Sequence, residues 1–370
     1  MKKKFLALVL TLSMVLSLVP MTALAAENSQ AGKTLTAAEG QTENAATNGD
    51  DQKDDSTTGG DNSTGGAATE EETTKKNPIV EVESVKYDIS SGDAIVVGCE
   101  KDVGELTIPK TISFEGTDYK VTKVVRGLQN NSTLRSVNIQ AEITTLDNSI
   151  FLNDTSLTSV TLPDTLKTIE TAAFENCASL TEIDLPEGLE VIKNSVFAGT
   201  AIEEITLPST LTQLQDKAFE NVTTLKTVDF NNAATTIGKA CFQGCNALET
   251  VSNTENVTEL GDYAFGSDSQ TVSSVNGSVN KHCQSLTGEI KLDSVTKIGK
   301  AAFKNCSSLK KVSGLNHVTV IPEEAFQSCG SLECVTGLEN VTELGKNAFA
   351  DCRILKGGKY TTGITVICSP

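Results

Sequence analysis

Cysteine and histidine are the side chains of this 370-residue chain that could form a reactive or metal-binding centre, and it has ten and two of them. His282 and Cys283 are adjacent, and Cys241 and Cys245 are four positions apart. No second His/Cys pair supplies the spacing of a zinc finger, and His317 stands alone. No Ser-His-Asp group has a local signature, although such triads can be assembled from residues that are distant in the sequence. We therefore expect no metal, no cofactor and no enzymatic activity.

Six cysteines share one position of a repeating pattern, three residues after a phenylalanine once an insertion is allowed for: Cys177, Cys245, Cys283, Cys306, Cys329 and Cys352. Ten cysteines in an exported chain would ordinarily suggest disulfides. Residues stacked in successive repeats point the same way, however, and their Cβ vectors do not converge as a relaxed disulfide requires. We expect a column of buried free thiols, with disulfides as the alternative. Cys334 should face outward on a strand and be the most reactive thiol.

The phenylalanines define the repeat that positions these residues. They fall at 151, 174, 197, 219, 242, 265, 303, 326 and 349, with gaps of 23, 23, 22, 23, 23, 38, 23 and 23. Counted from the leucine that follows each Phe, apolar residues recur at offsets 0, 3, 5, 9, 12 and 17, as in Leu157, Val160, Leu162, Leu166, Ile169 and Phe174. A period of about 20–29 residues headed by Leu-x-x-Ile-x-Leu is the signature of a leucine-rich solenoid.

One copy cannot fold alone, because burying six apolar side chains does not offset the entropy of ordering a whole repeat. Stacking pairs the strand backbones and closes the core between neighbouring turns. The sequence therefore predicts a repeat solenoid over residues 106–370, with about ten 23-residue leucine-rich repeats. We expect a parallel β-sheet face, mostly β and loops, with short helical or 3-10 turns.

Residues 173–180 and 302–309 both read Ala-Phe-x-x-Cys-x-x-Leu, and Leu-Pro or Ile-Pro follows several strands. With these motifs, the stretch from about 85 to 370 resembles the BspA-type leucine-rich repeats of bacterial surface proteins. Residues 105–127 resemble that family's usual entry into the array. The resemblance implies secretion and display at the cell surface, with adhesion proposed for several members. It implies no particular activity, because repeats of this kind are scaffolds with variable faces.

The chain departs from the family pattern at a few places. Leu128 takes the Phe position of the first copy, and the Cys position is taken by Asp154, Thr200 and Val222. Copies from residue 248 onward lose the Leu-Pro pair, and Glu289 occupies a normally apolar position. We expect a slightly irregular later half, with strand ends shifted by a residue.

Three segments precede the array. Residues 1–25 combine three lysines, an apolar run and an Ala-Leu-Ala site, which predicts a secretory signal peptide, with an uncleaved anchor as the alternative. Residues 26–77 are rich in Ala, Thr, Gly, Ser and acidic residues and predict a disordered linker, either a tether or a solubilising spacer. Residues 78–105 contain apolar, strand-like pieces and predict an N-terminal β cap.

The charge balance restricts the partners. With 48 acidic against 30 basic residues, the net charge is −18, which argues against nucleic acid or anionic lipid as a main partner. No segment beyond the signal is long and apolar enough to span a membrane. We expect a secreted or cell-surface protein whose partner is an extracellular protein or a glycan.

The outward side of the strands, at offsets 1, 2 and 4, is the first candidate binding surface. Its hydroxyl and carboxylate groups suit a glycan, a cation or a basic protein, but an ordinary solvated strand face has the same composition. It also lacks the Trp, Tyr and Arg side chains that usually dominate interfaces. The candidate residues are Arg135, Asn138, Thr158, Thr161, Glu182, Asp184, Glu203, Glu204, Lys226, Asp229 and Glu249.

The 38-residue gap holds the second candidate, an insertion of 38 − 23 = 15 residues at about 266–280. A loop of this length inside a compact domain is either functional or simply mobile. Its candidate residues are Gly266, Asp268, Gln270, Asn276 and Asn280.

The last residues, 364–370, begin another copy without a polar cap. Such an end predicts either a fragment of a larger surface protein or a packing partner at the last repeat. For the whole chain we expect a non-catalytic recognition or adhesion module, with a passive spacer that presents another domain as the alternative.

Overall fold

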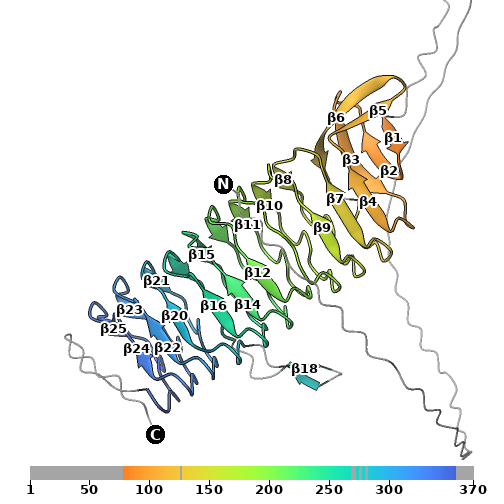
Figure 1. Cartoon of the computed structure of the whole chain (residues 1–370). Coiled ribbons are helices and arrows are strands. Elements are labelled where there is room, and N and C mark those ends of the chain that lie inside the picture. The colour runs from red at the N-terminus through yellow and green to blue at the C-terminus, as the bar shows by residue number, and fades with distance from the viewer. Residues whose placement is uncertain (1–77, 126, 268–271, 275–276, 280–281, 356–370) are drawn as a thin grey trace, which may run out of the picture. The chain divides into compact units, whose positions relative to one another are not determined.

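Figure 1 shows a computed structural model of the chain, which describes residues 78–125, 127–267, 272–274, 277–279 and 282–355. The predicted signal peptide (1–25), the predicted linker (26–77) and the C-terminal residues 356–370 lie outside the described residues. From residue 78 the chain enters a β cap and then winds into turns that follow one another along an array (Figure 1).

A five-stranded sheet forms the cap. Its order is β1-β2-β3-β6-β5, with β3 parallel to β6 and the other neighbours antiparallel. The cap reaches beyond the predicted boundary at residue 105, because β5 and β6 return to it after β4 has joined the array. The strands are β1 (Ile79–Val82), β2 (Val85–Asp88), β3 (Ala94–Cys99), β5 (Thr111–Phe114) and β6 (Thr117–Val124).

The predicted parallel face is present, and its outer side is called the strand face below. Its nine strands lie in three blocks of three rather than in one continuous ladder. The blocks are β4 (Glu105–Ile108), β7 (Ser136–Ile139) and β9 (Ser159–Thr161); β12 (Glu204–Thr206), β14 (Thr227–Asp229) and β16 (Thr250–Ser252); and β20 (Glu289–Lys291), β22 (Lys311–Ser313) and β24 (Cys334–Val335).

A second set of parallel strands, each two residues long, runs along another side of the array. Seven of them form one sheet, which crosses both interruptions of the strand face without a break. They are β8 (Thr145–Leu146), β10 (Thr168–Ile169), β11 (Val191–Ile192), β13 (Gln213–Leu214), β15 (Thr236–Ile237), β17 (Glu259–Leu260) and β21 (Lys297–Ile298), followed by the separate pair β23 (Val320–Ile321) and β25 (Glu343–Leu344).

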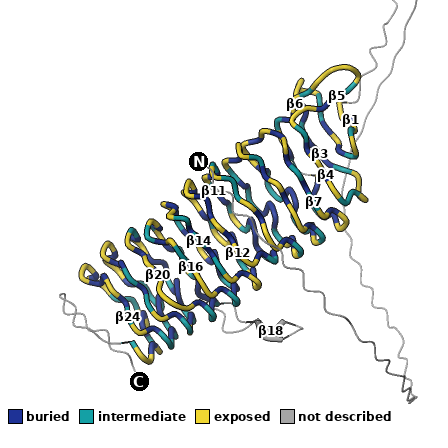
Figure 2. The backbone as a smooth tube through the Cα atoms, in the orientation of Figure 1, coloured by how far each residue is buried: buried dark blue, intermediate teal, exposed yellow. Residues whose placement is uncertain are grey.

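The phenylalanine column forms the centre of the core. Leu128 and the nine phenylalanines each occupy one turn and are buried. Buried, intermediate and exposed residues alternate along the tube in every turn of the array (Figure 2). Successive rings stack, with centroids 5.1 to 5.6 Å apart and planes within 24° of parallel. Each such pair contributes about 0.5–1.5 kcal/mol beyond the area it buries.

The segments around each Phe are turns, and the described residues contain no α-helix or 3-10 helix. The residue two before the Phe has positive φ in all nine phenylalanine turns, and the residue two after it in eight, as at Ala172 (58°) and Asn176 (61°). A right-handed helix requires consecutive negative φ angles, so these positions interrupt it at each turn. The short helical turns allowed for by the sequence are replaced by plain turns for this reason.

The later copies change register, as expected. Gly314 and Gly337 have φ of 84° and allow the apolar side chain to move from offset 5 to offset 6, where Leu315 and Leu338 are buried. In the copy after the insertion, Glu289 is exposed and its neighbour Ile290 is buried instead.

The strand face is interrupted at residues 182–185, which lie between β9 and β12 in the chain and form no strand. Among the described residues, no backbone hydrogen bond joins residues 182–185 to either neighbouring turn. Hydrogen bonds to neighbouring turns are present just before and just after the segment. Thr181 O accepts a hydrogen bond from Glu203 N at 3.1 Å, and β11 pairs with β10 and β13. The segment is therefore held at its ends and unpaired in its middle.

Asp154 occupies the Cys position of its turn and is fully buried. Its Oδ1 accepts a hydrogen bond from Asn131 N at 2.7 Å, while Oδ2 is buried without a partner. Burial raises the pKa of this carboxyl to about 7, against the opposing effect of the Asn131 hydrogen bond. An unfolded chain releases this proton near about pH 3.9.

We predict that Asp154→Cys, which restores the usual residue of the column, stabilises the protein at pH 8 more than at pH 4. Between about pH 4 and about pH 7 the folded chain holds a proton that the unfolded chain has released, so native stability falls as the pH rises through this window. Relieving a buried unsatisfied acceptor is worth about 1–3 kcal/mol. Thermal melts at both pH values measure the gain, with the exposed Asp164→Asn as control. An equal gain at both pH values would contradict the assignment.

We also predict fast amide hydrogen exchange at residues 182–185. Unpaired, solvent-exposed amides exchange from the native state without unfolding, whereas β14 is paired on both sides and opens only with the array. Exchange rates at residues 182–185 should exceed those at residues 227–229 by about tenfold or more. Equal protection of the two segments would show that the ladder is continuous in solution.

Candidate functional site

All eleven residues predicted for the strand face project outward. Nine of them are exposed, and Asn138 and Asp229 are half-buried. They lie beside apolar neighbours that point into the core, such as Val137, Ile205 and Val228. Because successive side chains of a strand point to opposite faces, the eleven predicted residues lie on one surface and their apolar neighbours lie in the core.

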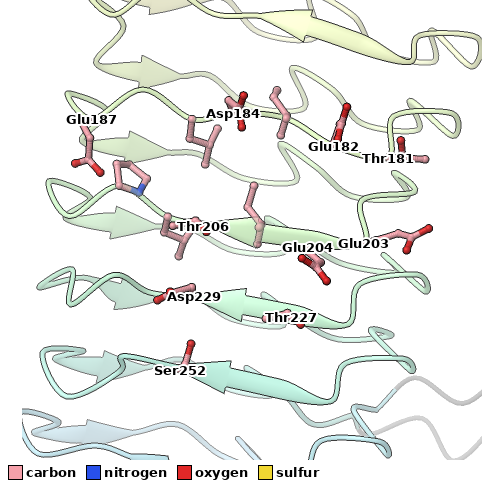
Figure 3. A pocket seen from close by; sticks show the side chains of 15 residues that line it. Thr181, Glu182, Asp184, Glu187, Glu203, Glu204, Thr206, Thr227, Asp229 and Ser252 are labelled. Carbon is pink, nitrogen blue, oxygen red and sulfur yellow. The ribbon is translucent and has the colours of Figure 1, made fainter. Parts of the chain in front are cut away.

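The structure gathers part of this set around a groove of about 710 Å³ (Figure 3). The unpaired segment 182–185 lines it with the neighbouring Thr181 and Glu187, together with residues in and beside β12, β14 and β16. Arg135, Asn138, Thr158, Thr161, Lys226 and Glu249 lie outside its lining. The candidate surface is thereby narrowed to five of the predicted residues, namely Glu182, Asp184, Glu203, Glu204 and Asp229.

The groove is acidic. Six carboxylates line it, those five and Glu187, and the lining contains no lysine, arginine or histidine. Three of the six are already engaged. Glu203 pairs with Lys226 at 2.6 Å, Glu187 accepts from Ser209 Oγ at 3.0 Å, and Asp229 accepts from Asn253 Nδ2 at 2.7 Å.

The other three carboxylates are available to a ligand. Glu182, Asp184 and Glu204 are exposed and have no hydrogen-bond or ion-pair partner within the described part of the chain. Carboxylates close together on one surface repel one another, and a cationic ligand would relieve that repulsion. Each exposed ion pair contributes only about 0–1 kcal/mol, so useful affinity requires several at once.

The lining of the groove has carboxylates and hydroxyls but no histidine, cysteine or lysine. No group of three or more His, Cys, Asp and Glu side chains comes together as a metal site among the residues that the structure describes. The carboxylates and hydroxyls can form ion pairs and hydrogen bonds with a ligand.

The predicted binding loop is placed only in part. Gly266 is buried, and a Cβ there would lie 2.2 Å from Ala301 O. Gly266 therefore packs against the next turn of the array. Within the insertion, β18 (Val272–Ser274) and β19 (Gly277–Val279) pair antiparallel. Asp268, Gln270, Asn276 and Asn280 lie outside the described residues.

The predicted thiol column is confirmed. The nine described cysteines are free, and the six of the column are buried. Each of these six donates its thiol to the backbone carbonyl of a phenylalanine in the preceding turn, as Cys177 Sγ does to Phe151 O at 3.1 Å. Burial raises the pKa of the Cys177, Cys245, Cys283, Cys306 and Cys329 thiols, which keeps them protonated and unreactive. Cys334 and Cys99 are only half-buried.

Sequence reasoning missed the unpaired segment and the lining residues Ile183, Leu185 and Glu187. One signal for it was present in the sequence. The gap of 22 residues between Phe197 and Phe219 leaves five steps from Phe197 to Ile202, where Phe174 and Leu180 are six apart. That shortened loop lies in the turn directly after the unpaired segment.

Comparison with known proteins places the chain among repeat proteins. A family model described as "BspA type Leucine rich repeat region (6 copies)" matches residues 144–271 and 268–369, which together are more than half of the chain. No curated protein matches it significantly. No helix in the described residues is long and apolar enough to cross a bilayer.

Several solved structures are similar. A leucine-rich repeat protein from Bacteroides ovatus is 24% identical, covers 75% of this chain and 81% of its own, and has a TM-score of 0.48. A leucine rich cell surface protein from Faecalibacterium prausnitzii is 22% identical, covers 75% of this chain and 87% of its own, and has a TM-score of 0.39. A leucine-rich repeat protein of T. pallidum is 19% identical over 62% of this chain and 90% of its own, with a TM-score of 0.46.

We predict that Cys334 reacts fastest with a thiol reagent such as DTNB in the native protein. Cys334 is half-exposed on β24, whereas the buried column thiols should react only after unfolding. Cys334→Ser should remove one equivalent of fast-reacting thiol, and Cys245→Ser should remove none. Loss of the fast phase in the Cys245 variant would contradict the burial of the column.

Proposed function

The chain belongs to the BspA-type leucine-rich repeat family, and from that premise we propose that it is a non-catalytic recognition module that acts outside the cell. Its binding surface is the strand face, centred on the acidic groove. The partner is an extracellular protein or a glycan that presents cationic or hydrogen-bonding groups. Adhesion follows from several weak contacts made at once along the array.

The acidic groove is the observation that carries this proposal. Six carboxylates surround a cavity without any basic residue in its lining, and three of them have no partner in the described chain. An ordinary strand face intersperses both signs, as this one does outside the groove at Lys311 with Glu289. The groove departs from that pattern and concentrates one sign, which favours a cationic partner.

Export rests on the first 25 residues, which have the composition of a secretory signal peptide. The acidic linker at 26–77 would then hold the array away from a surface. Retention of the protein at the cell surface is part of the proposal.

The test is binding of the purified protein to arrayed glycans and extracellular-matrix proteins. A groove variant combines Glu182→Gln, Asp184→Asn and Glu204→Gln, and a matched control combines Glu259→Gln, Glu339→Gln and Glu343→Gln, which change the same charge away from the groove. We expect the groove variant to lose about tenfold in affinity, or about 1.4 kcal/mol, and the control to keep it. Binding should also weaken as salt rises from about 0.05 M to about 0.5 M.

Two results would contradict the proposal. Equal loss in both variants would show that net charge, and not the groove, determines binding. A wild-type protein that binds nothing on either array would favour the passive spacer.

A further inference from the structure

The unpaired segment at residues 182–185 has unsatisfied backbone groups on an accessible face. In a regular turn, Arg135 O accepts from Thr158 N at 2.8 Å and from Ser159 N at 3.2 Å. The equivalent Thr158 O accepts no backbone N–H from the described chain, and none of the N–H groups of residues 181–185 donates to a backbone carbonyl. Neighbouring turns thus approach each other here without the hydrogen bonds that join them elsewhere.

The core is also partly exposed at this place. Leu185 is half-buried, whereas its counterparts Ile139 and Leu207 are 2% and 0% exposed. A second cavity of about 260 Å³ lies between residues 160–164 and residues 184–186, and it shares Asp184 and Leu185 with the acidic groove. The segment therefore presents an apolar contact, unpaired backbone and carboxylates together (Figure 3).

The interruption coincides with the only phenylalanine gap shorter than 23 residues. In the shortened loop after Phe197, Ala201 N donates to Leu180 O at 3.1 Å, so the following strand is drawn toward the start of the unpaired segment. Phe174, Phe197 and Phe219 remain stacked at 5.6 and 5.2 Å. The missing residue therefore affects the backbone pairing of the strand face and leaves the stacking of the core phenylalanines unchanged.

We propose that residues 182–185 dock an extended, lysine- or arginine-rich segment of a partner protein. The segment pairs its backbone with the unpaired N–H and C=O groups and places its cationic side chains against Glu182, Asp184 and Glu204. An apolar side chain between them contacts Leu185. This inference rests on the proposed function and assigns the partner's class and the point of contact.

The combination of unpaired backbone groups, carboxylates and an apolar side chain favours an extended peptide over other classes of ligand. Addition of an extended peptide to an unpaired strand supplies alternating donors and acceptors at the required spacing, with side-chain contacts adding specificity. A glycan offers hydroxyl groups but no regular peptide backbone, and a nucleic acid or acidic peptide is repelled by the carboxylates. A single metal ion would leave the amide N–H groups unsatisfied, because a cation accepts no hydrogen bond.

The test uses the full chain and a fluorescent decapeptide of alternating lysine and valine, with binding measured by anisotropy. The comparison peptide has the same sequence with N-methyl groups on alternate residues, which removes backbone donors and keeps the charge. We expect the methylated peptide to bind about tenfold more weakly, a difference of about 1.4 kcal/mol.

A matched pair of protein variants separates charge from backbone pairing. Asp184→Asn removes the carboxylate only, whereas Asp184→Pro also removes the backbone N–H, at a position where no hydrogen bond is lost within the described protein. Asp184→Asn should weaken binding about threefold and Asp184→Pro about tenfold beyond that. Thermal melts of both variants control for folding, and hydrogen exchange of the wild-type protein gives an independent reading. Amides at residues 182–185 should become protected when the peptide binds.

Equal affinity for the two peptides, or peptide binding without protection of residues 182–185, would overturn the docking site and leave only electrostatic attraction. The proposed function as a recognition module is tested separately, by binding to the glycan and matrix arrays. A wild-type protein that binds the arrays but not the peptide keeps the proposed function and refutes this inference.

Discussion

The spacing between neighbouring turns is the constraint on which the rest of the structure depends. Stacked phenylalanine rings lie 5.1 to 5.6 Å apart, close to the distance of about 4.7–4.9 Å at which parallel strands hydrogen-bond. A column of identical aromatic residues and a ladder of strands can therefore coexist in one repeat. Since no turn buries enough surface to fold alone, each keeps its shape only while both contacts to its neighbours are made.

The array responds differently to added and missing residues. The insertion before Cys283 contains the antiparallel pair β18–β19, and Phe265 still stacks on Phe303 at 5.3 Å. One missing residue after Phe197 cannot be accommodated outside the array, so it separates backbones on the strand face instead. In both cases the buried column stays in register and the exposed ladder is interrupted, because losing core packing costs more than leaving solvated backbone groups unpaired.

This asymmetry explains what the sequence could predict. The offsets of Leu, Ile and Phe predicted the solenoid, the buried thiols and the outward set from Arg135 to Glu249, because all of these follow from the repeat itself. The sequence did not reveal the extent of the cap sheet, since β6 pairs with β3 across the intervening β4 and β5 pairs with β6, which no local pattern shows. The groove was missed for a related reason. It arises where two turns fail to pair, and a repeat read copy by copy carries no information on how one copy fits the next. The start of the insertion has no periodic marker in the sequence, whereas the structure shows Gly266 packed against Ala301.

A uniform array presents the same strip of surface at every turn and gives a partner no reason to prefer one register over another. Specific recognition therefore requires a turn that differs from its neighbours. The buried side cannot differ freely, as the fully buried Asp154 illustrates, because a changed core residue leaves an unsatisfied group or a void. The strand face can differ, since its groups remain hydrated when they are unpaired. An unpaired segment on that face, together with carboxylates that lack partners, makes one place on a repetitive protein distinct at little cost to its stability.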